Sequence, residues 1–583
     1  MNIGRRLSRV GGRGLLVLVP LMILALACPQ EARAGGVVSV CNEAGLKAAV
    51  FGGGTVTFIC SGTITVLGGT ITISTDTTID GTGQTITISG GGEVQLFMVN
   101  TGITLSLKGL TVADGYVSGN GGGVMNLGTL KVSNSTFKGN AASATDNNSG
   151  GDGGGICNDG YLTVTNSTFE GNTASAGVFL PGVGDGGGIF NDNDATISNS
   201  TFHGNQGVSG GGIFTGSQSG GGLLVLNSSV FYNNQSTGLY YNAYAAPFGG
   251  GGLYNQGFIT VVTNSTFFGN GGKGASGGNI FNCCNNKGTA LLDNDTISGG
   301  IGDSGVGGNL ANVNNLDANP GSAPQGGALF AENTIVANAA SGSNCFGTFT
   351  DLGGNLRWPT RDATCLGSYG DPKLGTLANY GGPTWTLALQ PGSAAINTAI
   401  ESFCPGTDQR GVLRPQGPQC DIGAFEYSTS RLQGLGVIDH LDGFLDSLLS
   451  EAASDKLGRE VIRPLRDSLN PDLWPGSDGN HITGSEVFVL QGVAVDRLSR
   501  LIIDPRQLAY INNLVMADRN LAQVAMNDEG CFANPNPGPT AGIPPGPCVQ
   551  ATAELAAGDT AAGLGEYADA IGHYLNAWQF SNP

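Results

Sequence analysis

Short stretches of alternating apolar and polar residues recur along the first 340 positions of the chain. Residues 130–134 are Leu-Lys-Val-Ser-Asn, and residues 162–166 are Leu-Thr-Val-Thr-Asn. A period of two places successive side chains on opposite faces, which predicts β-strands. Earlier stretches rich in Thr, Ile and Val are separated by glycines and predict strands at residues 55–58, 63–66, 70–73 and 84–88.

A longer repeat surrounds these strands. The sequence Asn-Ser-Thr-Phe-x-Gly-Asn follows a strand, and after a variable stretch comes a glycine triplet with an apolar residue behind it. The Asn-Ser pair begins at residues 134, 166 and 199. The Phe-x-x-Asn motif spans residues 137–140, 169–172, 202–205, 231–234 and 267–270, with a weaker copy at 335–338, and the triplets begin at residues 121, 153, 186, 210 and 250. These Asn-Ser pairs are therefore 32 and 33 residues apart, a period that is typical of a solenoid.

Strands this short cannot bury an apolar face alone, so successive copies must stack on one another. Stacking places the asparagines of the Asn-Ser-Thr triplets in a column, where their amides can bond from coil to coil. The triplets also match acceptor sites for N-glycosylation, but their fixed place in the coil favours the ladder. The pattern predicts a mainly β fold, a right-handed single-stranded parallel β-helix, followed by a smaller α-helical C-terminal domain.

Composition divides the chain into five parts. Residues 1–34 begin with four arginines up to Arg13, followed by an apolar run and an Ala-Arg-Ala site, the pattern of a secretory signal peptide. We expect an N-terminal cap at residues 35–53 that contains a short helix at 41–50, the β-helix at 54–340 and a module closing it at 341–430. Apolar residues at helical spacing predict an α-helical accessory domain at 431–583.

The apolar run at residues 15–27 is too short for a transmembrane anchor and contains Pro20. No other segment is apolar enough to cross a bilayer, so we expect an exported protein, extracellular or on the bacterial cell surface. The formal charge is −19, although only 12% of residues are charged. An acidic exterior repels phosphates, which excludes nucleic acid as an expected partner.

Eleven of the twelve cysteines follow residue 34, and most form close pairs in the sequence. Export makes disulfides plausible. The predicted pairs are Cys41 with Cys60, Cys345 with Cys365, Cys404 with Cys420, and Cys531 with Cys548. Three cysteines remain, Cys157, Cys283 and Cys284, for which a free thiol or a vicinal bridge is expected, because no histidine lies near them to complete a zinc site.

The paired motifs Gly-Gly-x-Ile and Phe-x-x-Asn resemble the repeats of the polymorphic outer membrane proteins of chlamydiae, over residues 120–340. That resemblance implies a surface β-helix with a role in adhesion. A second set of motifs is similar to the choice-of-anchor Q domain of exported bacterial β-helix proteins. These motifs are Asp-Pro-Lys-Leu at 371–374, Leu-Gln-Pro-Gly-Ser-Ala-Ala-Ile at 389–396, Thr-Asp-Gln-Arg-Gly at 407–411 and Cys-Asp-Ile-Gly-Ala-Phe-Glu at 420–426. The charged residues of that module, Asp408, Arg410, Arg414, Asp421 and Glu426, are expected to form a structural ion-pair network.

Parallel β-helices include enzymes that cleave polysaccharides, so a catalytic role needs a test against the residues present. Hydrolysis requires clustered carboxylates, and lyase chemistry uses Ca²⁺ and a strong base. No arginine lies between residues 34 and 356, which disfavours a lyase. The weak catalytic candidates are Asp152, Asp185, Asp192 and Asp194, and Asp152 and Asp185, which stack at a spacing of one coil, are also weak candidates for binding Ca²⁺.

The sequence favours a secreted or cell-surface scaffold that binds carbohydrate or another surface ligand, with no assigned catalysis and no assigned cofactor. Tyr240, Tyr241 and Tyr244 are aromatic candidates for such contacts. A polysaccharide lyase or glycoside hydrolase with an Asp-based site is the first alternative, and a structural envelope component is the second. The ligand, the anchor and the oligomeric state stay open.

Overall fold

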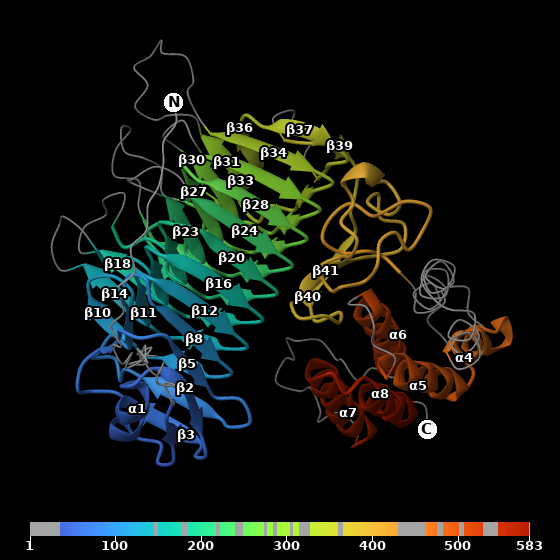
Figure 1. Ribbon diagram of the computed structural model, residues 1–583. Helices are drawn as coiled ribbons and strands as arrows, with labels where there is room; N and C mark the ends of the chain where they lie inside the picture. The colour runs from blue at the N-terminus through green and yellow to red at the C-terminus, as the bar shows by residue number, and fades with distance from the viewer. Residues whose placement is uncertain are drawn as a thin grey trace, which may run out of the picture.

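Stacked parallel strands form the body of the molecule, a parallel β-helix (Figure 1). The computed structural model describes residues 35–144, 150–176, 183–216, 222–238, 249–272, 277–283, 288–302, 307–313, 327–359, 365–428, 461–474, 482–500, 506–528 and 546–581. Successive coils pair in parallel within these residues, and the C-terminal part of the chain is helical. The predicted β-helix and the smaller helical region are therefore confirmed.

Three long parallel sheets, called A, B and C, run along the helix axis, and a shorter sheet D lies beside them in the central coils. Within the described residues, sheet A has twelve strands: β1 (Val37–Val38), β2 (Gly54–Phe58), β5 (Thr77–Asp80), β8 (Thr104–Lys108), β12 (Thr129–Ser133), β16 (Tyr161–Thr165), β20 (Ala195–Ser198), β24 (Leu223–Asn227), β28 (Ile259–Thr263), β31 (Thr289–Asp293), β34 (Ala328–Glu332) and β37 (Thr350–Gly353). Sheet B has twelve in the same part of the chain: β3 (Gly62–Thr65), β6 (Ile86–Ser89), β9 (Thr111–Ala113), β13 (Thr136–Lys138), β17 (Thr168–Glu170), β21 (Thr201–His203), β25 (Val230–Tyr232), β29 (Thr266–Phe268), β32 (Thr296–Ser298), β35 (Ile335–Ala337), β38 (Leu356–Trp358) and β39 (Ser368–Tyr369).

Two further sheets complete the coils. The described strands of sheet C number ten: β4 (Ile71–Ile73), β7 (Phe97–Val99), β11 (Val124–Asn126), β15 (Ile156–Asn158), β19 (Ile189–Asn191), β23 (Ile213–Gly216), β27 (Leu253–Gln256), β30 (Ile280–Cys283), β33 (Gly307–Val313) and β36 (Ser343–Gly347). Those of sheet D number five: β10 (Tyr116–Ser118), β14 (Ala141–Ala144), β18 (Thr173–Ala176), β22 (Gln206–Gly207) and β26 (Gln235–Ser236). A coil runs from sheet C to A, then B, and in the central coils on to D, and the variable loop follows.

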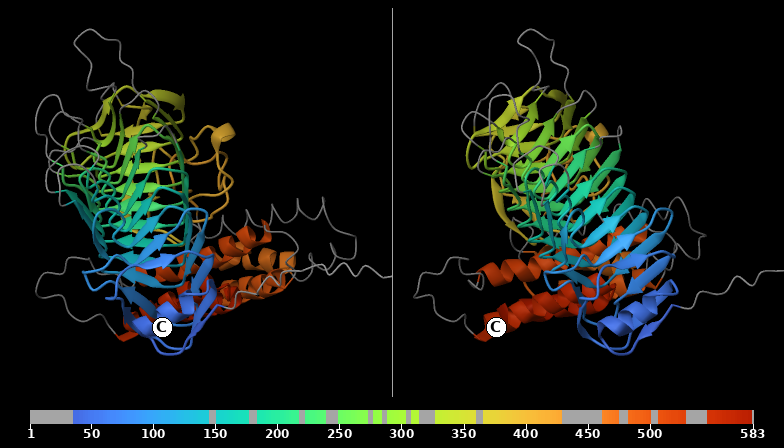
Figure 2. Two further views of the ribbon diagram at one scale, coloured as in Figure 1. Left: turned by 60° about the vertical axis from the view of Figure 1, so that its left-hand side comes forward. Right: turned by 90° about the vertical axis from the view of Figure 1, so that its left-hand side faces the viewer.

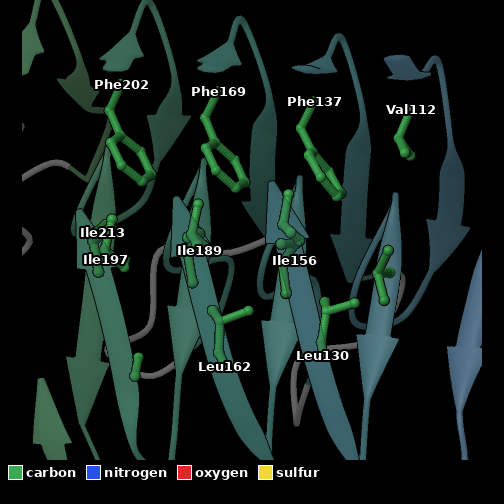
Figure 3. Packing of buried hydrophobic residues seen from close by; sticks show 14 of the residues in the cluster. Val112, Leu130, Phe137, Ile156, Leu162, Phe169, Ile189, Ile197, Phe202 and Ile213 are labelled. Atoms are coloured by element: carbon green, nitrogen blue, oxygen red, sulfur yellow. The ribbon is translucent and has the colours of Figure 1, made fainter. Parts of the chain in front are cut away.

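The core is built from identical residues stacked in register. Leu130 pairs with Leu162 in sheet A, and Phe137 pairs with Phe169 in sheet B. The phenyl rings of Phe137, Phe169 and Phe202 lie parallel, with centroids 5.0 and 4.7 Å apart (Figure 3). Because each ring covers the face of the next and none is exposed, the column stabilises the stacking of coils as well as the core of each coil.

Two ladders of side-chain amides run inside the coils. In the longer ladder the Nδ2 of each asparagine donates to the Oδ1 of the next over 2.8–2.9 Å. Its members are Asn140, Asn172, Asn205, Asn234, Asn270, Asn279, Asn309 and Asn344. The second ladder lies at the end of sheet C and is formed by Asn126, Asn158, Asn191 and Thr215, and again by Asn255, Asn282 and Asn312. In both ladders the buried side-chain amides are hydrogen-bonded, whereas unpaired buried amides would destabilise the fold.

The asparagines of the Asn-Ser-Thr triplets do not form the predicted ladder. Asn134 and Asn166 turn the corner between sheets A and B with φ of 48° and 49°, a conformation that asparagine tolerates better than most residues, and their side chains are exposed. The serine that follows makes the ladder at this corner instead. The backbone N–H of Ser135 donates to Oγ of Ser167, and that of Ser167 donates to Oγ of Ser200, both over 3.2 Å.

The helix α1 (Glu43–Val50) covers the N-terminal end of the coils, as predicted for residues 41–50. Asn42 caps it by accepting the N–H of Gly45, and Leu46, Ala49 and Val50 are buried. The other end extends past the expected boundary at 340, because β36, β37, β38 and β39 continue the three sheets in parallel. The repeat motifs fade in these last coils, which is why the sequence did not show them.

Residues 371–428, here called the flanking module, do not lie across the last coil as expected for a closing module. They contain the antiparallel strands β40 (Leu374–Ala378) and β41 (Thr386–Leu389) and the turn η1 (Glu401–Phe403). The module packs along the corner between sheets A and B, where Asn264 donates to the carbonyl of Thr407 and Asn333 to that of Ile400. The corner asparagines therefore hold the module.

The helical domain lies beside the N-terminal coils, so the chain doubles back along the β-helix (Figures 1 and 2). Its elements are α4 (Arg463–Ser468), η3 (Pro471–Leu473), α5 (Glu486–Ser499), α6 (Arg506–Asp528), α7 (Gly546–Leu564) and α8 (Tyr567–Ser581). In the part of the chain that the structure describes, no helix is both long and apolar enough to span a bilayer. The predicted signal peptide at residues 1–34 lies outside the described residues.

Three predicted disulfides are confirmed: Cys41–Cys60, Cys345–Cys365 and Cys404–Cys420. Cys548 is also disulfide-bonded, while Cys531, its predicted partner, lies outside the described residues. Of the three remaining cysteines, Cys157 is a buried free thiol and Cys283 is disulfide-bonded, and Cys284 lies outside the described residues.

Candidate functional site

Asp152 and Asp185, two of the predicted candidates, stand on adjacent coils just before the glycine triplets, as their spacing required. Oδ1 of Asp152 accepts the backbone N–H of Asp185 over 2.9 Å, and Oδ1 of Asp185 accepts that of Ser209 over 2.8 Å. Asn120 holds the same place one coil earlier and accepts the N–H of Asp152. Both carboxylates are buried. They thus form a third ladder, in which side-chain oxygens hold the start of the next coil.

Burial raises the pKa of the Asp152 carboxyl to about 7, against the opposing effect of its backbone hydrogen bonds. Burial, followed by the charges of Asp159, Asp152 and Asp192, also raises the pKa of the Cys157 thiol. The structure therefore brings Asp152, Asp159 and Asp192 around one buried thiol on sheet C. Within the described residues, no group of three or more His, Cys, Asp or Glu side chains is placed to hold a metal ion.

Asp194 lies apart from this group, at the turn that enters sheet A. Its carboxylate is exposed and accepts the N–H of Leu223 from the next coil over 2.9 Å. Three of the four predicted aspartates, Asp152, Asp185 and Asp194, consequently have a backbone amide of a neighbouring coil as a partner. This is the geometry expected of carboxylates that order turns.

A different row of side chains gathers on the outer face of sheet B. The x residues of the Phe-x-x-Asn copies are Lys138, Glu170, His203, Tyr232 and Phe268, and strand pairing places them one above the other. Lys138 Nζ lies 3.2 Å from the Glu170 carboxylate. The rings of His203 and Tyr232 stack with centroids 4.9 Å apart and planes 5° apart. The face thus carries a charged pair followed by an aromatic stack.

Trp385 of the flanking module extends the aromatic stack. Its ring lies 5.8 Å from that of Tyr232 at 7° between planes, and 45% of the residue is exposed. The backbone beside it is fixed, because Thr384 Oγ1 donates to the carbonyl of Ser228 and Gln409 Nε2 donates to the carbonyl of Trp385. The indole is therefore held on the sheet by contacts that do not involve the ring.

Glycines make the surface beside the row flat. Gly171, Gly204 and Gly269 follow the outward residues and adopt φ of 61° to 64°, which favours glycine over residues with a Cβ. A Cβ on Gly171 would meet no atom within 4 Å, so the surface is open at this position. Burial lowers the pKa of His203. The row therefore forms a ledge, in which stacked aromatic rings lie beside the backbone of the glycines.

A hollow of about 510 Å³ continues the ledge toward the C-terminal coils. It is lined by Asn233, Gln235, Gly269, Gly271, Ile301 and Ser341 among others. Asn233 directly follows Tyr232 in the chain, so the hollow and the aromatic row adjoin. The hollow thus offers amide groups, one hydroxyl and one apolar side chain in a concave surface next to aromatic rings.

The predicted aromatic candidates Tyr240, Tyr241 and Tyr244 lie outside the described residues. Lys138, Glu170, His203 and Tyr232 hold the x position of successive Phe-x-x-Asn copies, so the repeat places them in one line on the outer face of the coils. The motif alone gives no sign that these outward side chains form a site, because the residue type at this position varies from copy to copy. Trp385 had no such signal, since it belongs to no repeat.

The fold makes this chain a parallel β-helix protein. No family model matches it, and no curated protein matches it either. Among solved structures it is similar to "Crystal structure of pectate lyase Pel9A", with a TM-score of 0.38 and 16% sequence identity over 68% of this chain and 98% of that chain. The two family resemblances noted in the sequence accordingly remain expectations.

Proposed function

We propose that this protein is an exported β-helix scaffold that binds polysaccharide along the outer face of sheet B. The observation that carries the proposal is the continuous row from Lys138 to Trp385, with the hollow beside it. A polysaccharide is a chain of repeating units, and a row of side chains at the regular spacing of the coils can contact successive sugar units. Three disulfides support an oxidising, extracellular setting.

The ring edges of His203, Tyr232 and Trp385 offer apolar contact to sugar C–H groups. Glu170 and Lys138 offer an acceptor and donors for hydroxyls or for an acidic sugar. A screen of the purified chain against acidic and neutral polysaccharides on an array tests the proposal. Binding to at least one class of polysaccharide is expected, whereas no retained ligand would favour a structural envelope component.

Polysaccharide cleavage is the second candidate function. The observation that favours it is Asp152, whose pKa is raised to about 7 by burial, beside the carboxylate of Asp159. A general acid needs such a pKa at neutral pH. The ladder contacts of Asp152 and Asp185 favour the scaffold, since both carboxylates already hold backbone amides. Release of reducing or unsaturated sugars that is lost in Asp152→Asn would establish the enzyme instead.

A further inference from the structure

A second cavity lies between the flanking module and the helical domain. It has a volume of about 380 Å³. Asn379 and Arg410 line it from the flanking module, and Asn512, Arg519, Asp559 and Tyr574 line it from α6, α7 and α8. Cavities between domains are common ligand sites, and this volume is in the range of small ligands.

The helical side of the cavity is a preorganised polar network. Arg519 is almost fully buried and donates to both oxygens of Asp559, from Nε over 2.6 Å and from Nη2 over 2.9 Å. The Tyr574 hydroxyl donates to Oδ1 of Asp559 over 3.0 Å. A carboxylate has about four acceptor positions, so Asp559 retains one for a further donor such as a sugar hydroxyl.

The module side presents a guanidinium with an uncommitted donor. Arg410 is 2% exposed and uses Nε and Nη2 to bind Asp408, and Nη2 also donates to the carbonyl of Glu426. Its guanidinium lies 3.6 Å from the centre of the Phe425 ring. Within the described residues Nη1 of Arg410 makes no hydrogen bond, so this nitrogen is the donor left for a ligand in the cavity.

These groups together match one chemical class. Arginine pairs with carboxylates through charge-assisted hydrogen bonds. Of the two nearly buried arginines that line the cavity, Arg519 is committed to Asp559 and Gln523, so Arg410 is the one left to pair with a ligand carboxylate. Asn379, Asn512 and Asp559 offer donors and acceptors for hydroxyls, while Val515 and Met516 supply apolar contact. We propose that this interdomain cavity binds a uronic acid, free or at the end of a glycan chain. No lining residue of this cavity belongs to the sheet B row, so the site is proposed independently of that face.

Gly563 of α7 allows the cavity to be filled without disturbing the fold. It lines the cavity, and a Cβ on it would meet no atom within 4 Å. Gly563→Leu therefore places a side chain in the open space. Gly572→Leu is the matched control, because Gly572 is also an exposed helical glycine with open space around its Cβ and lies outside this cavity.

The test is calorimetric titration of the full chain with sodium glucuronate and sodium galacturonate, and with glucose, galactose and acetate as comparisons. Saturable binding of a uronate is expected. Its affinity should exceed that of the corresponding neutral sugar by about tenfold or more, because the neutral sugar lacks the hydrogen bond between charged groups. Gly563→Leu should abolish it at an unchanged melting temperature, and Gly572→Leu and Tyr232→Ala should retain it.

The proposal is overturned if no uronate binds saturably, or if Gly563→Leu binds as the wild type does. Equal affinity for the neutral sugars would refute the role given to Arg410. Loss of uronate binding in Tyr232→Ala would place the sugar on sheet B and overturn the interdomain site, while leaving the proposed function of that face intact.

Discussion

The side-chain amide of Asn270 donates to Oδ1 of Asn279 over 2.8 Å, although the two residues hold different places in their coils. Asn270 ends the Phe-x-Gly-Asn motif, whereas Asn279 stands where the preceding coil has Gly252. In the coil of Asn279 the motif position is Gly300. The ladder thus passes from the position that follows sheet B to the position that precedes sheet C, and it stays continuous. In each of these coils one of the two positions holds an asparagine and the other a glycine.

The continuity of this ladder predicts a large cost for removing a member from its middle. Asn205 accepts hydrogen bonds from the backbone and the side chain of Asn172 and donates to Asn234 and to the carbonyl of Phe169. Asn205→Ala leaves buried donors and acceptors unpaired, so the free energy of unfolding should fall by about 2–4 kcal/mol. Denaturant unfolding measures this loss.

Gln206→Ala is the control for that variant, because Gln206 is the adjacent amide and is exposed. Its substitution should change the free energy of unfolding by less than about 0.5 kcal/mol. Equal effects of the two substitutions would show that the buried amide column does not stabilise the coils.

The repeat predicted the strands and their register because identical residues must stack for the coils to share a core, as Phe137, Phe169 and Phe202 do. It did not predict which asparagine faces inward. The direction of a corner depends on φ, and φ of 48° at Asn134 turns that side chain to solvent. The place of Asn279 in the ladder could not be predicted from the sequence either, because it depends on the register between coils and not on the motif.

Stability should depend on pH through Asp152. The pKa of this carboxyl is raised in the folded state to about 7, above the value of about 3.9 for an unfolded chain. The folded state then binds a proton more tightly, so this contribution to stability is complete below pH of about 4 and is lost as the pH rises through about 7. The free energy of unfolding should fall over that range by on the order of 2–4 kcal/mol.

Asp152→Asn should flatten this pH dependence, and Asn120 at the same place one coil earlier shows that an amide fits there. Asp194→Asn is the comparison, because Asp194 also accepts a backbone N–H but is exposed. A pH profile that stays as steep in Asp152→Asn as in the wild type would contradict the role given to this carboxyl.

Gln491 on α5 is fully buried, and neither its Oε1 nor its Nε2 has a hydrogen-bond partner within the described residues. Replacing it with leucine removes two unpaired polar groups at similar volume. Gln491→Leu should therefore raise the free energy of unfolding of the helical domain by about 1–3 kcal/mol. Thermal unfolding followed by helical circular dichroism measures the gain, and Gln579→Leu, at an exposed position of α8, should give none.

The flanking module contains an ion pair whose loss should be costly. Arg414 and Glu426 are fully buried and 3.0 Å apart, in the network expected from the sequence. Glu426→Gln leaves a buried guanidinium without its counter-ion, so stability should fall by about 3–5 kcal/mol. Asp496→Asn removes the exposed pair with Arg500 and should cost less than about 1 kcal/mol. Similar melting temperatures for the two variants would contradict this assignment.

The sequence indicated the binding surface less well than it indicated the fold. Lys138, Glu170, His203 and Tyr232 share a motif position, and their common row follows from the repeat once its register is known. Trp385 could not be placed, because it reaches Tyr232 from the flanking module, and the docking of that module depends on contacts such as Asn264 with Thr407. Contacts between distant segments carry no periodic signal.

The central claim is that polysaccharide binds along the outer face of sheet B. The most direct measurement is the affinity of the wild type, Tyr232→Ala, Trp385→Ala and Tyr161→Ala for the polysaccharide that the array identifies. Tyr161 is a suitable control because it is 59% exposed on sheet A, away from the row. Each row variant should bind about tenfold or more weakly, and Tyr161→Ala should bind as the wild type does. Unchanged affinity in both row variants would contradict the account.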